Sequence, residues 1–117
     1  MRDARRKPAA EMDLEAFRQS LREAQPPALP PALRALWHLA RNEWDAAHAI
    51  VQGQSDRDSE RVHAHLHRVE GDLPNARYWY ARASTEPQTG ALDEEWRALA
   101  SEQLAALAGG AGTAQRD

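Results

Sequence analysis

Histidine is the residue type in this sequence whose spacing best suits chemistry. All five histidines lie between residues 38 and 67. His63 and His67 are four residues apart, so on a helix they share one face, as paired metal ligands do. His38 precedes His67 by 29 residues, the period of an internal repeat, so stacked repeat units would bring it near them. The pattern predicts a metal site of His38, His63 and His67; His48, on the intervening helix, could join them or point elsewhere.

Two interpretations of this histidine group stay open. Three or four imidazole nitrogens around one ion would suit zinc or a similar divalent metal, with an oxygen from Asp45 or Glu60. On the other interpretation the histidines are partly buried packing residues, and no cofactor is expected. His65 would lie on a different helix face from His63 and His67. The group also lacks the glutamate of the His-Glu-x-x-His metalloprotease pattern.

Two carboxylate–imidazole pairs at helical spacing, Glu60 with His63 and His67 with Glu70, could serve acid–base catalysis. Helix surfaces often carry such pairs without any catalytic role. The sequence has no glycine-rich phosphate loop and no Gly-x-Ser-x-Gly motif, and the absence of cysteine excludes a thiol nucleophile. We therefore assign no catalytic residue and favour a protein that is not an enzyme.

The aromatic residues form a second group of interest. Each tryptophan falls on an apolar helix stripe, which is typical of core packing. Tyr78, Trp79 and Tyr80 are consecutive and cannot all face inward, so we expect Tyr78 to be exposed. An exposed tyrosine flanked by Arg77 and Arg82 is a candidate contact for a protein partner.

Composition favours helices as the elements that position these residues. The chain has 117 residues, which suits one domain, and Val, Ile and Thr together number only seven. We predict an all-α fold of about five to six helices. The net charge of −3 argues against nucleic-acid binding, and no apolar run suits a signal peptide or a membrane span. We expect a soluble, cytoplasmic protein.

Prolines, glycines and potential caps divide the chain into five segments. Asp13 can cap a first helix, whereas four prolines between residues 26 and 31 prevent a helix interior there. We predict a disordered basic tail at 1–12, an N-terminal helix at 13–25, a Pro-rich connector at 26–31, a helical-repeat domain at 32–108 and a disordered tail at 109–117.

Five helices are expected within the helical-repeat domain. Gly53 should end one of them as a left-handed cap, and Gly71 should end the next. The last helix, 92–108, begins with the acidic run 93–95, which we interpret as a solvated first turn. The residues expected to face inward on the fourth and fifth helices of the chain are Val62, Leu66, Val69, Leu73, Ala76, Tyr80 and Ala83.

An internal repeat relates the two central helix pairs. A shift of 29 residues places Leu33 on Val62 and Trp37 on Leu66, and the pairs at later positions match in the same way. One helix–turn–helix unit cannot bury its own apolar face, so the two units must stack. The sequence therefore predicts two helix pairs side by side with a shared apolar seam.

The second unit resembles the tetratricopeptide repeat. The resemblance lies in Gly71-Asp72-Leu73-Pro74-Asn75-Ala76, followed by Tyr80, Ala83 and Pro87. The period of 29 residues is shorter than the ~34 of that family, and the first unit has Asn42-Glu43 in place of Gly-Asp. The resemblance implies stacked helix–turn–helix pairs that bind a protein or a peptide.

Residues 33–84 are also similar to a family of short bacterial proteins, a resemblance that implies no activity. It is carried by stretches such as Ala35-Leu36-Trp37-His38, Val62-His63-Ala64-His65-Leu66-His67-Arg68 and Asn75-Ala76-Arg77-Tyr78-Trp79-Tyr80. Two functional hypotheses result. The first is a non-catalytic, tetratricopeptide-like interaction module with a protein or peptide partner, or a homodimer. The alternative is a protein that binds a metal or small ligand through its histidines.

Overall fold

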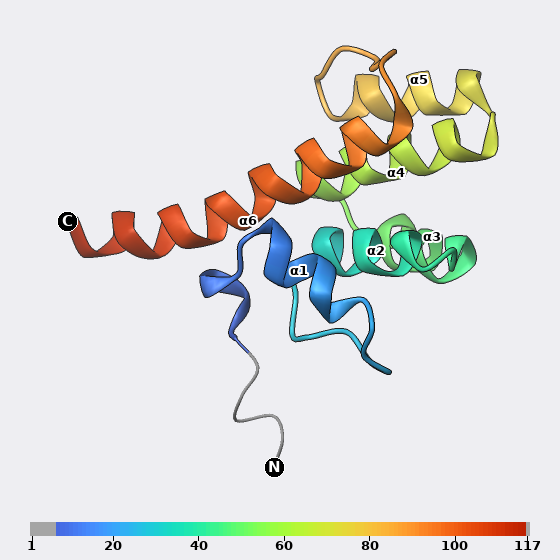
Figure 1. Ribbon diagram of the computed structural model, residues 1–117. Helices are drawn as coiled ribbons and strands as arrows, with labels where there is room; N and C mark the ends of the chain where they lie inside the picture. Colours follow the sequence, from blue (N-terminus) through green and yellow to red (C-terminus); the bar gives the residue numbers. More distant parts are fainter. Residues whose placement is uncertain (1–6, 117) are drawn as a thin grey trace.

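The computed structural model describes residues 7–116, with side chains described up to residue 109. The described part of the chain is helical and contains no strand, which confirms the predicted all-α fold (Figure 1). A short 3-10 helix, η2 (Ala9–Glu11), precedes the α-helices. These are α1 (Leu14–Ser20), α2 (Pro31–Ala40), α3 (Trp44–Gln52), α4 (Arg57–Glu70), α5 (Leu73–Arg82) and α6 (Leu92–Arg116).

Two helical hairpins form the centre of the fold. Helix α2 packs along α3, and α4 packs along α5, while both helices of the first hairpin also contact α4. Helix α6 contacts α2 and α4 and also packs against α1 and η2 (Figure 1). Helix α4 therefore has neighbours on opposite sides. Its histidines can meet residues of different helices on each side, as described below.

Side-chain caps explain where three of the helices begin. The carboxylates of Asp13, Asp56 and Asp72 each accept a hydrogen bond from the backbone N–H three residues later, at 2.9, 3.0 and 3.2 Å. Such N-caps satisfy amide groups that lack a partner in the first helical turn. The three aspartates therefore set where α1, α4 and α5 begin.

The turns between helices follow the sequence less closely. Gly71 has a φ of 87°, so it ends α4 in the left-handed region that a glycine adopts without strain. Gly53 was expected to do the same after α3, but its φ is −93° and that prediction is wrong. Asn42 takes the left-handed conformation in the first hairpin, with a φ of 63°. Asparagine tolerates this region better than most residues do.

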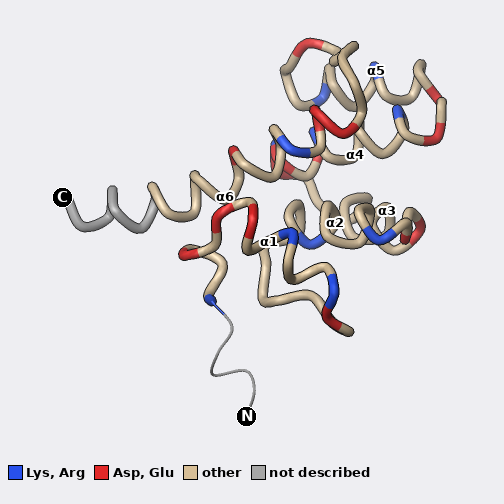
Figure 2. The backbone as a smooth tube through the Cα atoms, viewed as in Figure 1, with Lys and Arg blue, Asp and Glu red and all other residues tan. Residues whose placement is uncertain are grey.

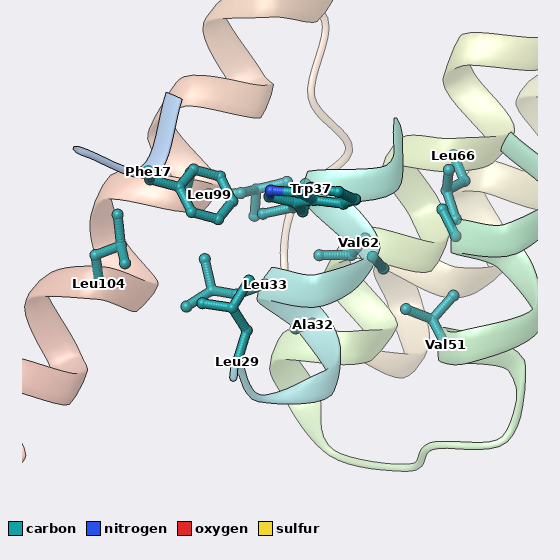
Figure 3. Packing of buried hydrophobic residues seen from close by; sticks show 14 of the residues in the cluster. Phe17, Leu29, Ala32, Leu33, Trp37, Val51, Val62, Leu66, Leu99 and Leu104 are labelled. Atoms are coloured by element: carbon teal, nitrogen blue, oxygen red, sulfur yellow. The ribbon is translucent and has the colours of Figure 1, made fainter. Parts of the chain in front are cut away.

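The core consists of one large cluster and one small one. Trp37, Leu66 and Phe17 are at most 1% exposed and belong to the large cluster, which also takes in Leu99 and Leu104 of α6 (Figure 3). Tyr80 is 2% exposed but packs in a separate cluster with Ala64 and Ala76. The predicted apolar seam is therefore buried, although it is divided between the two sides of α4.

Several predicted boundaries need correction. Residues 1–6 of the predicted tail lie outside the described residues, but Met12 is 8% exposed and packs in the core, as does Leu29 of the Pro-rich connector. Burying an apolar side chain stabilises even a short irregular segment. Helix α1 ends at Ser20 rather than near residue 25, because the N–H groups of Leu21, Arg22 and Glu23 donate to carbonyls three residues earlier and the chain leaves the α-helix through tighter turns.

The last helix also differs from expectation. Helix α6 continues to Arg116, so its predicted end at Ala108 is wrong, and of the predicted tail only residue 117 lies outside the described residues. Glycine disfavours a helix interior without forbidding it. Gly109 and Gly110 are not in the left-handed conformation that would have ended the helix.

Two residues predicted to face inward are on the surface. Val69 is 38% exposed and Leu73 is 52% exposed, and the two residues flank the Gly71 turn that joins α4 to α5. Asp and Glu are interspersed with Lys and Arg along the chain (Figure 2). No described helix combines the length and the apolar character needed to cross a membrane.

Candidate metal centre

Three of the five histidines converge between the two hairpins. His63 and His67 lie one turn apart on α4, and His48 approaches them from α3. Ligand nitrogens of the three rings all lie within 4.8 Å of one another, and the Nε2 atoms of His48 and His63 are 3.1 Å apart. Around a tetrahedral zinc ion, nitrogens at about 2.1 Å from the metal would be about 3.4 Å apart. The separations found here, 3.1 Å and up to 4.8 Å, lie on either side of this spacing, and an ion bound to His48 and His63 would replace the hydrogen bond between their Nε2 atoms.

Two tryptophans hold the imidazole rings in place. Trp44 of α3 stacks on His48 with ring centroids 4.8 Å apart, and Trp79 of α5 stacks on His63 at 3.9 Å. The Trp44 indole N–H also donates a 2.9 Å hydrogen bond to the carbonyl of Leu66, which fastens α3 to α4 beside the site. The rings are thus oriented before any ligand arrives, which favours binding.

The environment keeps these imidazoles in the form that binds metals. His63 is only 3% exposed, and burial, with the nearby His48 and His67, lowers its pKa from 6.5 to about 4. Burial and His67 also lower the pKa of His48. Both rings are neutral at pH 7, as a metal ligand must be. The Nδ1 atom of His63 is buried and has no hydrogen-bond partner.

His67 has a carboxylate behind it. Its Nδ1 donates a 2.7 Å hydrogen bond to Glu70, because the carboxylate can only accept. This bond fixes the tautomer and leaves Nε2 available for an ion, an arrangement common behind metal-ligating histidines. Asp72 lies within 4.8 Å of this pair, but its side chain already caps α5. The predicted His67–Glu70 pair is present in the structure.

The other predicted partners of the cluster lie elsewhere. His38 forms a 2.8 Å contact with Glu43 at the turn of the first hairpin and does not join the cluster. Axes of packed helices are about 8–10 Å apart, so equivalent positions on α2 and α4 need not meet. Glu60 pairs with Arg82 at 3.4 Å rather than with His63, and Asp45 is not among the converging ligand groups.

A second buried polar cluster was not predicted from the sequence. Glu95 of α6 is 8% exposed, although we expected its acidic run to be solvated. One oxygen of Glu95 contacts His65 Nδ1 and Arg68, both at 2.7 Å, and the other accepts a 2.6 Å bond from the Tyr80 hydroxyl. Glu95 precedes Leu99 by one helical turn, and this i, i+4 spacing was the signal that could have placed it on the buried face.

The pKa values of Glu95 and Tyr80 reflect the hydrogen bonds within this second cluster. Burial by itself would raise the pKa of Glu95, but the hydrogen bonds from His65 and Tyr80 outweigh it and the pKa lies below its usual value. Burial, together with Glu95, raises the pKa of Tyr80. The carboxylate is therefore ionised and the phenol neutral at pH 7. Each polar group of Glu95 is satisfied within the protein.

The predicted partner-binding residues lie on the outer side of α5. Tyr78 is 52% exposed, as expected, and Arg77 is exposed beside it. Arg82 is not a free surface residue, because it donates to the Tyr78 hydroxyl at 3.2 Å and lies 5.3 Å from the Trp79 ring centroid. A role for Tyr78, Arg77 and Arg82 in partner binding stays a prediction.

Comparison with known proteins found no matching protein family, curated protein or solved structure.

Proposed function

We propose that this protein binds a divalent transition-metal ion through His48, His63 and His67. The observation that supports this proposal is the convergence of three ligand nitrogens within 4.8 Å of one another, on rings supplied by two different helices. The low pKa of His63 and the His67–Glu70 hydrogen bond add to it, since both favour a neutral, oriented ligand set.

The ligand set also defines the class of site. Imidazole nitrogens suit zinc, copper, nickel and iron, so zinc or a similar divalent metal is the natural occupant. Closed structural zinc sites have four protein ligands, whereas three protein ligands leave one position for water or a small molecule. The proposed site is therefore one that can bind a further ligand.

The direct test uses protein purified without a histidine tag and stripped of metal. We expect Zn²⁺ titration calorimetry to give one bound equivalent, and Co²⁺ to give the visible absorption of a tetrahedral nitrogen site. His63→Ala and His67→Ala should abolish the binding, whereas His38→Ala serves as the matched control and should retain it. Absence of stoichiometric binding, or an equal loss in all three variants, would refute the proposal.

A second candidate function is the tetratricopeptide-like interaction module that the repeat predicts. It is favoured by Leu73 and Tyr78, which are both 52% exposed on the same hairpin with Arg77 between them. Exposed tyrosine and arginine are frequent in binding hot spots. We expect Tyr78→Ala combined with Arg77→Ala to abolish capture of a protein partner or of a second copy of the chain. Arg97→Ala is the control, and capture that is unchanged in the double variant would argue against the module.

A further inference from the structure

Trp79 is enclosed between the candidate metal ligand His63 and the guanidinium group of Arg82. The indole is nearly parallel to the imidazole, with an interplanar angle of 12° and centroids 3.9 Å apart. Arg82 lies 5.3 Å from the centroid of the same indole, within the range of a cation–π contact. Trp79 thus has an attractive neighbour beyond the histidine that it covers.

Arg82 is itself fixed by a residue on the metal-site helix. Its Nη2 lies 3.4 Å from the Glu60 carboxylate, and Glu60 is 6% exposed and three residues before His63 on α4. Its Nη1 donates to the Tyr78 hydroxyl at 3.2 Å. The chain of contacts therefore runs from Glu60 on α4 through Arg82 and Trp79 on α5 and returns to His63 on α4.

We propose that Arg82 is a positioning residue of the metal centre, which holds Trp79 against His63 and thereby slows exchange of the bound metal. This inference rests on the proposed metal-binding function. A ligand ring that is held by stacking keeps its nitrogen directed toward His48 without losing further rotational freedom when the ion binds. The same indole covers one face of His63 and limits the access of water to the site.

Arg82 is half-exposed, whereas its partner Glu60 is buried. The two side chains are 47% and 8% exposed, so Arg82→Ala leaves a buried carboxylate without its ion-pair partner and lowers the free energy of unfolding as well as releasing Trp79. The double variant Arg82→Ala with Glu60→Gln removes this unpaired charge and should release Trp79 and speed Zn²⁺ loss all the same. Arg77 is the matched control, because it is an exposed arginine on the same helix and its proposed role, in partner binding, does not enter either readout.

The experiment combines two readouts on the full chain loaded with Zn²⁺. The first is the ¹⁹F NMR signal of 5-fluorotryptophan at position 79, assigned through Trp79→Phe and recorded with and without metal. The second is the rate at which EDTA removes the bound Zn²⁺. Loss of an outer residue that orients a metal ligand typically weakens binding 10–100-fold. We expect Arg82→Ala to shift the Trp79 signal and to speed Zn²⁺ release by about 10-fold or more.

The controls decide between the possible outcomes. Arg77→Ala should change neither readout, and Arg82→Lys should give an intermediate rate because it keeps the charge without the planar fork. If the wild type binds Zn²⁺ but Arg82→Ala behaves like Arg77→Ala, the positioning role is wrong and the metal site stands. If the Trp79 signal shifts while the release rate stays unchanged, the positioning role is again overturned. A wild-type chain that binds no Zn²⁺ refutes the proposed function and this role together.

Discussion

Helix α4 carries two histidine clusters on different faces, and they differ in how completely their polar groups are paired. On one face His65 meets Glu95, whose two oxygens accept hydrogen bonds from three side chains. On the other face His63 meets His48, and its buried Nδ1 has no hydrogen-bond partner. Two histidines only two positions apart therefore differ: His65 Nδ1 bonds to a carboxylate whose oxygens are both paired, whereas His63 Nδ1 is buried without a hydrogen-bond partner.

The two clusters differ in what they can contribute to stability. The buried carboxylate of Glu95 contacts a histidine and an arginine of α4 and a tyrosine of α5, so it joins α6 to the second hairpin. The histidine cluster keeps one buried nitrogen, His63 Nδ1, without a hydrogen-bond partner, so we expect it to contribute less to stability than the carboxylate cluster does. The predictions below test this contrast, beginning with the largest expected effect.

The carboxylate cluster should matter most for stability. Glu95→Ala leaves Arg68 without its buried partner, and breaking a buried ion pair typically costs about 3–5 kcal/mol. We expect the free energy of unfolding, measured by urea denaturation, to fall by that amount. His48→Ala in the histidine cluster should lower it much less. A loss below about 1 kcal/mol in Glu95→Ala would contradict the contrast.

The histidine cluster should make stability depend on pH. The pKa of His63 is about 4 in the folded chain and near 6.5 when unfolded, so between these values the unfolded chain binds the extra proton. The contribution is complete above about pH 6.5 and is lost as the pH falls toward 4, up to about 3 kcal/mol. Urea denaturation of wild type and His63→Gln at pH 7 and at pH 4.5 tests this prediction. An equal change in the free energy of unfolding between the two pH values in both proteins would argue against it. His38→Gln should retain the wild-type pH dependence of the free energy of unfolding.

Metal binding should stabilise the folded chain through the histidine cluster alone. At a free Zn²⁺ concentration of 100 times Kd, the free energy of unfolding should rise by about 2.7 kcal/mol. Differential scanning calorimetry would record this as an increase in Tm. The increase should vanish in His67→Ala and persist in Glu70→Gln at higher Zn²⁺ concentration. An increase that persists in His67→Ala would place the ion elsewhere.

Glu70 should affect the metal without being its ligand. Glu70→Gln weakens the hydrogen bond that orients His67, so we expect a 10–100-fold higher Kd for Zn²⁺, measured by competition with a chromogenic chelator. The stoichiometry should stay at one. Complete loss of binding would instead make Glu70 a direct ligand.

His38 should have the smallest effect of the residues that the sequence assigns to the site. Its contact with Glu43 is partly exposed, so His38→Ala should lower the free energy of unfolding by less than about 1 kcal/mol. Zn²⁺ affinity should stay within about twofold of wild type. A larger change in affinity would bring His38 back into the metal site.

The features that could be predicted from sequence are those that depend on neighbours in the chain. The cap at Asp13 and the helix end at Gly71 need only a few consecutive residues. The shared face of His63 and His67 follows from the pitch of one helix. The all-α fold and the two hairpins follow in the same way, from composition and from a repeat that each unit must bury.

The completion of both clusters was decided by the tertiary structure. The third histidine is His48 and not His38, because the approach of α3 to α4 depends on how the two hairpins pack. The burial of Glu95 depends on where α6 crosses α4, and helix spacing alone does not state which face a distant helix will cover. Sequence determined the geometry within each helix, whereas the distances between helices arose from the packing of the whole chain, to which residues far apart contribute.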